Sequence, residues 1–295
     1  MKKLLAIILA LTMILALAAC GQTTQAPAAE APATEAPAVE APAAEPQEEA
    51  ATTSPVLAKI LSDGKLVVGT EAQYAPYEFK DLNAEFAGCD IFLAEKIAEK
   101  LGVELEIVDM AFDGIIPAVQ AGQVDLGIAA FTNTPERAQV IDFSDIYEVS
   151  LQYLVVAAEN VETYSTKEAL AGMKLGAQKG TIQSNLIVSV FPESELFELD
   201  KYPELALEVQ NGNIAGLVVD AAVGDSLVAN SNGALAVSAY EFTKEEASFG
   251  KSVVIQKGNE DLVAIVNEVI AEVLADGSYQ AAYDEAVALA ASLGL

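Results

Sequence analysis

Apolar and polar residues alternate along the chain in a pattern that predicts strands and helices in turn. Three short apolar runs have the length of buried strands: residues 65–69, 104–108 and 124–128. Between the first two, residues 90–101 place apolar side chains on one helical face, and the helix is expected to end at Gly102. Asp113 is expected to cap a second helix that runs to Ala121. This order predicts a parallel sheet with helices on its faces.

A second series of the same kind follows Tyr147. Its expected strands are residues 151–156, 174–177, 195–199, 217–219 and 252–255. Its expected helices are residues 167–171, 181–190 and 203–210, one that Asp220 opens and one that ends at Ala275. The two series predict an α/β fold of two lobes, each a mostly parallel sheet flanked by helices, with boundaries 54–148 plus 250–295 for lobe 1 and 149–249 for lobe 2. Ligands of open α/β sheets lie beyond the carboxyl ends of the strands, so the site is expected where those ends meet.

Polar side chains follow the strand at residues 124–128. Thr134 is a plausible N-cap and Pro135 suits the first helical position, so a helix is expected to begin there. Its free backbone donors, the hydroxyl of Thr132 and the guanidinium of Arg137 then converge on one point. That combination suits a carboxylate ligand. A surface arginine beside an ordinary helix cap is the alternative.

The first 53 residues differ in composition from the rest. A basic start and an apolar run at residues 4–17, too short to span a membrane, indicate a signal peptide. The sequence Leu17-Ala18-Ala19-Cys20-Gly21 resembles the lipobox of bacterial lipoproteins. The resemblance implies that residues 1–19 are removed and that Cys20 is diacylated and anchors the protein to the cell membrane. A plain secretory signal with a chance cysteine is the alternative.

Residues 20–53 are expected to form a disordered tether between the membrane and the folded part. Ala-Pro-Ala-x-Glu repeats in tandem from residue 26 to residue 45. Regular prolines prevent a helix, like charges favour extension, and large apolar residues are almost absent from this stretch.

Composition limits the possible partners. The chain has 15 Lys and Arg against 44 Asp and Glu, a formal net charge of −29, so nucleic acid and anionic membrane surfaces are not expected to bind. There is no histidine, and Cys89 has no second cysteine beside it once Cys20 is lipidated. Zinc sites, histidine-dependent triads and intramolecular disulfides are therefore excluded, and neither a metal nor a cofactor is expected.

Several motifs in order resemble the polar amino-acid solute-binding proteins of ABC importers, the bacterial extracellular solute-binding proteins of family 3. They are residues 69–79, Gly88-Cys89-Asp90-Ile91, 112–117, 132–137, 143–145, 178–183, Val219-Asp220 and 249–251. The resemblance extends from about Val56 onward. It implies two lobes that close on a ligand about hinges near residues 147–150 and 247–251. It also implies a monomeric, non-enzymatic receptor that passes a free amino acid to ABC permease subunits.

The resemblance also implies roles for individual residues around the ligand's charges. Arg137 would bind the α-carboxylate, assisted by Thr132 and Thr181. Asp220 would pair with the α-ammonium, together with the carbonyl group of Ala130. The charges alone support this assignment, because a buried zwitterion needs a partner for each charge. For Asp220 a simple helix cap is the alternative.

The ligand's side chain would meet a separate group of residues. Tyr74 and Phe112 would sandwich it, with core packing as the alternative. Glu71 stands where basic-amino-acid binders of the family have an acid facing the ligand's cationic end. With Gln183 nearby, it favours arginine, lysine or ornithine, although Glu71 could equally be a solvated loop residue.

Two other functions fit the same sequence. One is an enzyme similar to the periplasmic cyclohexadienyl dehydratases, which would need a proton donor in the cleft, such as Asp220 or Glu71. The other is a surface lipoprotein that reports ligand to a membrane sensor rather than to a transporter.

Overall fold

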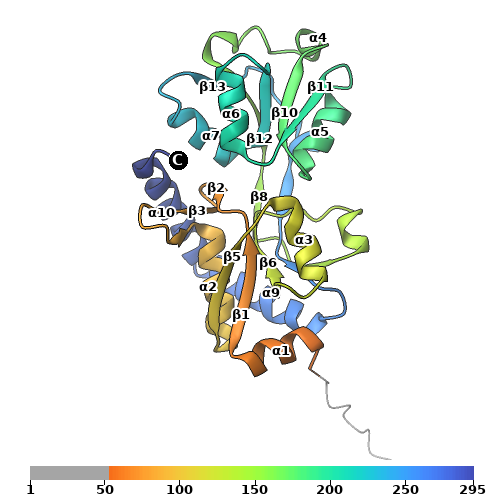
Figure 1. Cartoon of the computed structure of the whole chain (residues 1–295), viewed down its shortest axis with the longest axis vertical. Coiled ribbons are helices and arrows are strands. Elements are labelled where there is room, and N and C mark those ends of the chain that lie inside the picture. The colour runs from red at the N-terminus through yellow and green to blue at the C-terminus, as the bar shows by residue number, and fades with distance from the viewer. Residues whose placement is uncertain (1–52) are drawn as a thin grey trace, which may run out of the picture. The chain divides into compact units, whose positions relative to one another are not determined.

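The computed structural model describes residues 53–295, which form one compact unit (Figure 1). The predicted signal peptide, the lipidated Cys20 and almost the whole tether lie outside the described residues. Within residues 53–295, no helix combines the length and the apolar character needed to cross a membrane.

The first lobe is built on a five-stranded sheet with the order β5-β1-β6-β15-β7. Its strands are β1 (Lys65–Thr70), β5 (Glu104–Asp109), β6 (Leu126–Gly127), β7 (Asp142–Phe143) and β15 (Val254–Ile255). Its helices are α1 (Pro55–Asp63), α2 (Cys89–Leu101), α3 (Phe112–Gln120), α9 (Glu260–Ala275) and α10 (Ser278–Leu293). β15 pairs antiparallel with both its neighbours, whereas β1 is parallel to β5 and β6, so β15 alone runs against the others.

The second lobe repeats this plan with the order β11-β10-β12-β9-β13. Its strands are β9 (Gln152–Ala157), β10 (Lys174–Gln178), β11 (Glu195–Leu199), β12 (Gly216–Asp220) and β13 (Leu235–Val237). Its helices are α4 (Lys167–Leu170), α5 (Ile182–Val190), α6 (Tyr202–Gln210), α7 (Ala221–Ala229) and α8 (Lys244–Ala247). Here β9 is the reversed strand. Each sheet is thus mixed: four of its five strands run in one direction, but two of its four pairings are antiparallel. The expected α/β lobes with flanking helices are confirmed, and their sheets are less parallel than the alternating pattern predicts.

Two short strands connect the lobes. β8 (Glu148–Ser150) and β14 (Phe249–Lys251) pair antiparallel, with Lys251 opposite Glu148, and form a ribbon between the two sheets (Figure 1). The chain passes through β8 into the second lobe and returns through β14.

Burial follows the apolar pattern in both lobes. In α2, Leu93, Ala94 and Ile97 are fully buried, and Gly102 ends the helix in the left-handed conformation, as expected. Among the described residues, the largest part of the apolar core extends over both lobes, with residues of β1, α2 and α9 in the first and of α6 and β12 in the second. In the second lobe, Leu154 and Leu175 pack with the apolar face of α5.

Some local predictions were wrong. Asp113 does not cap α3, because Ala111 is the N-cap and the Asp113 carboxylate pairs instead with Lys179 across the lobes at 2.9 Å. The expected loop at residues 70–79 contains β2 (Gln73–Tyr74) and the start of β3 (Glu78–Lys80), which pairs with β4 (Phe86–Ala87). These strands are too short to show a period of two.

The helix expected after Thr134 does not form. A single 3₁₀ turn, η1 (Arg137–Gln139), stands in its place, with Glu136 as N-cap. No residue of η1 is buried, so the segment lacks the apolar face whose packing would extend a short helix. The Thr134 hydroxyl still accepts a hydrogen bond from the N–H of Arg137, at 3.3 Å.

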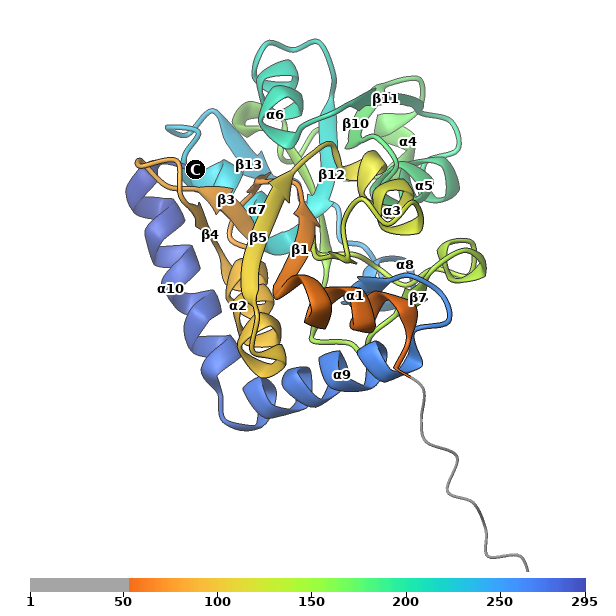
Figure 2. The same cartoon turned by 60° about the horizontal axis from the view of Figure 1, so that its bottom comes forward.

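The C-terminal helix α10 has no counterpart among the predicted elements. Its sequence is rich in alanine, so its buried side, which includes Tyr279, Ala286 and Ala290, gives only a weak pattern of large apolar residues. It packs against α2 and α9 of the first lobe and against α7 of the second (Figure 2).

Candidate ligand-binding site

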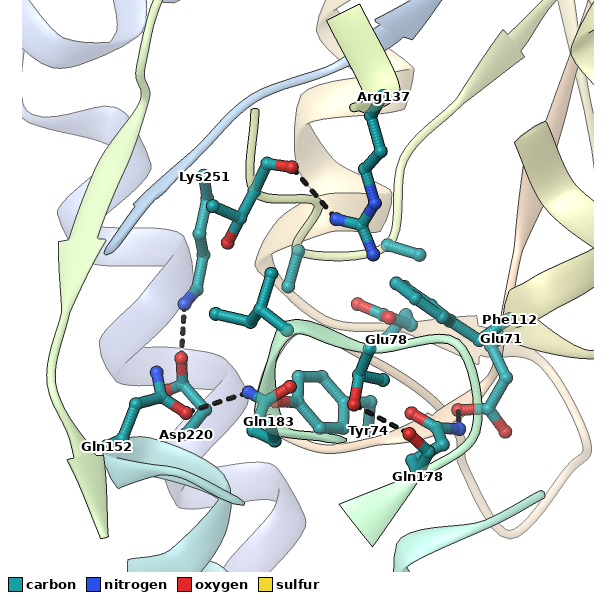
Figure 3. A pocket seen from close by; sticks show the side chains of 15 residues that line it. Glu71, Tyr74, Glu78, Phe112, Arg137, Gln152, Gln178, Gln183, Asp220 and Lys251 are labelled. Atoms are coloured by element: carbon teal, nitrogen blue, oxygen red, sulfur yellow. Dashed lines mark hydrogen bonds and ion pairs between the residues drawn. The ribbon is translucent and has the colours of Figure 1, made fainter. Parts of the chain in front are cut away.

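A cavity lies between the lobes, and the side chains that line it leave about 20 Å³ free, enough for about one water molecule. The structure brings all nine predicted binding residues to its lining: Glu71, Tyr74, Phe112, Ala130, Thr132, Arg137, Thr181, Gln183 and Asp220 (Figure 3). Six further residues line it: Glu78, Ala129, Gln152, Gln178, Ile182 and Lys251. Many of these residues stand at or just after the ends of β1, β6, β10 and β12, where the strands' carboxyl ends face one another.

Arg137 is oriented by two backbone carbonyl groups. Its Nη1 donates to the carbonyl oxygen of Thr132 at 2.8 Å, and its Nη2 donates to that of Gly180, in the other lobe, at 3.0 Å. Arg137 is half-buried, and the desolvation of its guanidinium lowers its pKa to about 10, so the group remains charged at neutral pH. Since arginine has five N–H donors, the two carbonyl groups leave donors for a carboxylate. The helix dipole expected to assist Arg137 is missing, because η1 is one turn long.

A strained turn separates β6 from Arg137. Ala130 has a φ of +48°, in the left-handed region that residues with a side chain seldom adopt. Its N–H donates to Oδ2 of Asp90 at 2.7 Å, and the hydroxyl of Tyr147 donates to the same oxygen at 3.0 Å. Asp90 is fully buried, and burial raises its pKa to about 6. The Asp90 carboxylate therefore holds the Ala130 peptide in place from behind the cavity.

Asp220 ends β12 and caps α7, so it does have the helix-cap role that the sequence offered as an alternative to ligand binding. Its Oδ1 accepts from the N–H of Ala222 at 3.3 Å and lies 3.2 Å from the hydroxyl of Tyr77, whose one proton has a shorter contact with Oε1 of Glu148, at 2.7 Å. Its Oδ2 accepts from Nζ of Lys251 at 2.5 Å and from the hydroxyl of Ser150. The Asp220 and Lys251 side chains are each only 3% exposed. Asp220 thus caps a helix and also forms a buried ion pair at the cavity.

Sequence reasoning missed Lys251. The motif 249–251 placed it near a hinge, but gave it no role. Its Nζ also donates to the hydroxyl of Ser150 at 2.6 Å and lies 4.5 Å from the centre of the Tyr77 ring. A lysine within the apolar stretch that surrounds β14 and β15 was the available signal, because a charge in such a stretch needs a buried partner.

Glu71 is not a solvated loop residue, since it is only 4% exposed. Its Oε2 accepts from Nε2 of Gln178, across the lobes, at 3.3 Å. Burial raises the pKa of Glu71 to about 7. Gln183, expected to assist Glu71, instead donates from Nε2 to Oε1 of Gln152 at 2.7 Å. The Gln183 amide is therefore partly committed to its own lobe.

Glu78 is a second buried acid in the lining that sequence reasoning missed. It is 1% exposed, and its Oε2 has no hydrogen-bond partner among the described residues. Burial, and then the charges of Asp90 and Glu71, raise its pKa well above the usual range for a carboxyl group. Neither Glu78 nor Glu71 forms an ion pair within residues 53–295.

The two predicted aromatic residues already have aromatic neighbours. Tyr74 stacks on Tyr77 with centroids 5.7 Å apart and tilts against Tyr202 at 5.3 Å. Phe112 stacks on Phe131 at 4.6 Å. Both residues therefore pack in the protein interior and also present a surface to the cavity.

Thr181 is the N-cap of α5, but its hydroxyl donates to the carbonyl oxygen of Gln178 at 2.6 Å. What remains toward the cavity is the first turn of α5, whose backbone N–H groups have no partner within the helix. Among residues 53–295 no group of acidic or cysteine side chains is arranged to hold a metal ion.

Two α/β lobes joined by a two-stranded ribbon, with a cation and an anion in the cavity between them, define a solute-binding protein of the periplasmic-binding-protein fold. The chain belongs to the bacterial extracellular solute-binding proteins, family 3, whose sequence model matches residues 66–287. The predicted family and fold are thereby confirmed.

Relatives and solved structures agree with this family. The L-cystine-binding protein TcyJ of Escherichia coli K12 is 30% identical over 226 residues, which cover 77% of this chain and 84% of TcyJ. The amino acid ABC transporter substrate-binding protein AbpA of Streptococcus pneumoniae, solved with L-arginine, superposes with a TM-score of 0.76 at 31% identity, covering 79% of this chain and 98% of AbpA. The ancestral amino acid-binding protein AncCDT-1, a precursor of cyclohexadienyl dehydratase, gives a TM-score of 0.71 at 32% identity and covers 78% and 98%. The chain is a solute-binding protein and not an enzyme.

Proposed function

We propose that this protein captures a free amino acid with a cationic side chain, such as arginine, lysine or ornithine, outside the cytoplasm and presents it to an ABC permease. The observation that supports this best is one cavity lined by Arg137, Asp220 and the buried carboxyl group of Glu71. The three groups offer a partner for each charge of such a ligand. AbpA, an ABC transporter protein solved with L-arginine, is similar to this chain in sequence and fold.

The ligand's backbone is assigned to Arg137 and Asp220. The guanidinium of Arg137, with Thr132 and the first turn of α5 at Thr181, would receive the α-carboxylate. Asp220 and the carbonyl group of Ala130 would receive the α-ammonium. The strained turn at Ala130 and its bond to Asp90 support this assignment, because backbone strain is characteristic of ligand sites.

The side chain of the ligand is assigned to Glu71, with Tyr74 and Phe112 beside it. Burial raises the pKa of Glu71 to about 7, although the hydrogen bond from Gln178 and the charge of Lys201 act in the opposite direction. Glu71 has no cation as an ion-pair partner within residues 53–295. A guanidinium or ammonium group from the ligand would supply that partner and favour the ionised carboxylate. A ligand with a neutral side chain would leave Glu71 without an ion-pair partner. A ligand with a cationic side chain is therefore expected to gain more binding free energy in this cavity.

We further propose that Cys20 carries the lipid anchor and that the two lobes close about the β8–β14 ribbon as a monomer. Substituting Cys20→Ser is expected to move the protein from the membrane fraction to the soluble fraction without changing its affinity for the ligand. An unchanged distribution would rule out anchoring through Cys20. Purification of permease subunits with the protein would support transport, whereas a membrane sensor in their place would support signalling.

A thermal-shift screen of the purified protein against the common amino acids, ornithine, citrulline and cystine tests the ligand class. The protein is first refolded from denaturant to remove any bound ligand. A ligand at about 1,000 times its Kd adds about 4 kcal/mol, which corresponds to about 8–16 °C in Tm. The largest shift is expected with arginine, lysine or ornithine. A shift with cystine, the ligand named for TcyJ, would support an amino-acid receptor but contradict the role proposed for Glu71. The absence of any shift would contradict amino-acid binding.

A further inference from the structure

The Asp220 carboxylate already has three donors from the chain. Ala222 donates to Oδ1, and Lys251 and Ser150 donate to Oδ2. The Tyr77 hydroxyl lies 3.2 Å from Oδ1, but its one proton has a shorter contact with Oε1 of Glu148, at 2.7 Å. Lys251 is the one cation among these donors, so it compensates the charge of the carboxylate.

Lys251 is the donor most similar to the ammonium group of a ligand. Its Nζ is a primary ammonium, like that of an amino acid, and it lies 2.5 Å from Oδ2 of Asp220 in the lining of the same cavity. The other two donors, Ala222 and Ser150, are neutral and cannot compensate the carboxylate charge. Two ammonium groups on one buried carboxylate would leave an excess positive charge, which burial strongly disfavours. Exchange of one cation for the other avoids that cost.

We propose that Lys251 is a tethered competitor for the α-ammonium subsite, so that the ligand's ammonium binds Asp220 by displacing the Lys251 ammonium. The proposal rests on the proposed function, since it assigns a residue to the same amino-acid site. Lys251 would keep Asp220 paired whenever a ligand ammonium group is absent. It would also reduce the net binding free energy that the ligand's ammonium group contributes, because the Lys251–Asp220 pair must be broken.

Glu78 gives the displaced lysine another partner. It lines the same cavity, is 1% exposed, and its Oε2 has no hydrogen-bond partner among residues 53–295. Lys251 is close enough for its charge to act against the burial that raises the pKa of Glu78. The flexible stem of a lysine allows its head to move between two carboxylates of one cavity.

The position of Lys251 in the fold connects this exchange with the ribbon between the lobes. Lys251 ends β14, Ser150 ends β8, and Asp220 belongs to the second lobe. The backbone of Lys251 also forms a bridge to Thr132, next to the turn that carries Arg137. Movement of the Lys251 ammonium group would therefore change contacts at the hinge. It would also change contacts beside the subsites for the ligand's α-carboxylate and α-ammonium groups.

The experiment compares L-arginine with 5-guanidinopentanoic acid, which is the same molecule without its α-ammonium group. Calorimetry measures the Kd of both for the wild type and for Lys251→Met, which keeps the length of the stem but removes the charge. In the wild type the analogue leaves Lys251 on Asp220, so it is expected to bind no more than about 10-fold more weakly than L-arginine. In Lys251→Met the analogue leaves Asp220 unpaired, and the ratio is expected to exceed about 100-fold.

Lys257→Met is the matched control. Lys257 pairs with Asp142 at 3.0 Å, but its side chain is 45% exposed and lies outside the cavity lining. This variant is expected to keep the wild-type ratio. If Lys251→Met also keeps the wild-type ratio, Lys251 does not compete with the ligand and the proposal is wrong.

A crystal structure of the wild-type protein with L-arginine decides the matter if Lys251→Met does not fold. Exchange requires that Nζ of Lys251 move out of hydrogen-bond distance of Asp220, and a retained bond would overturn the proposal. Binding of L-arginine with a retained Lys251–Asp220 pair would refute the exchange alone. Failure of any amino acid to bind the wild type would refute the proposed function, and the exchange with it.

Discussion

At the scale of single residues, the cavity is lined by charged groups that differ in how well the chain satisfies them. Arg137 is bonded only to carbonyl oxygens and has no carboxylate partner within residues 53–295. Asp220 is paired with Lys251, whereas neither Glu78 nor Glu71 forms an ion pair in the part of the chain that the structure describes. These differences determine which residues can form a new ion pair with a ligand. They therefore determine how much binding free energy is expected to be lost when each residue is substituted.

Arg137→Ala is expected to weaken amino-acid binding by about 2–5 kcal/mol, because it removes the partner of a buried carboxylate. Calorimetry with the amino acid found in the thermal screen measures the change. Lys257→Ala, which removes an exposed cation, serves as the control and is expected to leave the affinity unchanged. Equal affinities in Arg137→Ala and the wild type would remove Arg137 from the site.

Glu71 is expected to make the stability of the ligand-free protein depend on pH. Its pKa is about 7 in the folded protein against the ordinary value of 4.5 for a glutamate side chain, so its contribution to stability is complete below about pH 4.5 and is lost as the pH rises through 7. At pH 8 the loss amounts to about 3 kcal/mol at most. Glu71→Gln should therefore be more stable than the wild type at pH 8 and gain nothing at pH 4.5.

Urea unfolding of both proteins between pH 4.5 and pH 8 provides the measurement. The difference between the two proteins isolates Glu71 from Asp90 and Glu78, which also titrate in the interior. A difference that stays constant over the whole range would show that Glu71 is not the titrating group.

Most of the lining could be predicted because its residues belong to motifs that follow predicted strands. The directions of the Glu78 and Lys251 side chains could not be predicted, for a physical reason. Lys251 reaches the cavity from the three-residue strand β14, and Glu78 from a hairpin of two- and three-residue strands. Short strands leave no periodic pattern, so the direction of their side chains depends on pairing that only the folded chain reveals.

At the scale of elements, the strands and helices with a clear apolar period were predicted. One expected helix does not form, and one helix of the structure was not predicted. The helix expected near Arg137 has suitable end signals but no apolar face, so it remains one turn. α10 has a buried face made largely of alanine and was missed. End signals and composition are thus weaker guides than a face of large apolar residues.

The start of α2 depends on a glycine whose backbone has a φ of +125°. A Cβ atom on Gly88 would lie 2.0 Å from the carbonyl oxygen of Tyr77, so Gly88→Ala must move the backbone. The variant is expected to lose more than about 2 kcal/mol of stability. Gly114→Ala is the control within α3, where nothing lies within 4 Å, and it is expected to gain about 0.5–1 kcal/mol.

Thermal unfolding of the two variants measures the contrast. Since both substitutions add one methyl group, opposite signs would show that backbone conformation and space, not composition, decide the outcome. A stable Gly88→Ala would mean that the loop before α2 is freer than its geometry indicates.

At the scale of the whole described unit, side chains and backbone of the two lobes meet across the cavity. Asp113 of α3 pairs with Lys179 after β10 at 2.9 Å, and Arg137 bonds to Gly180 beside it. The Asp113–Lys179 pair is partly exposed, so Asp113→Ala is expected to cost no more than about 1 kcal/mol in affinity, chiefly through faster ligand release. Stopped-flow measurements at low and high salt would test this, and a slower release would contradict a closing role for the pair.

The ribbon of β8 and β14 also constrains the order of folding. Every strand of the second sheet comes from residues 152–237, so this sheet can be completed as soon as that stretch has left the ribosome or the membrane channel. The first sheet must wait, because β7 joins it only through β15, which follows the whole of the second lobe in the chain. The second lobe is thus an insertion in the first, and its sheet can form before the sheet that surrounds the insertion point is complete.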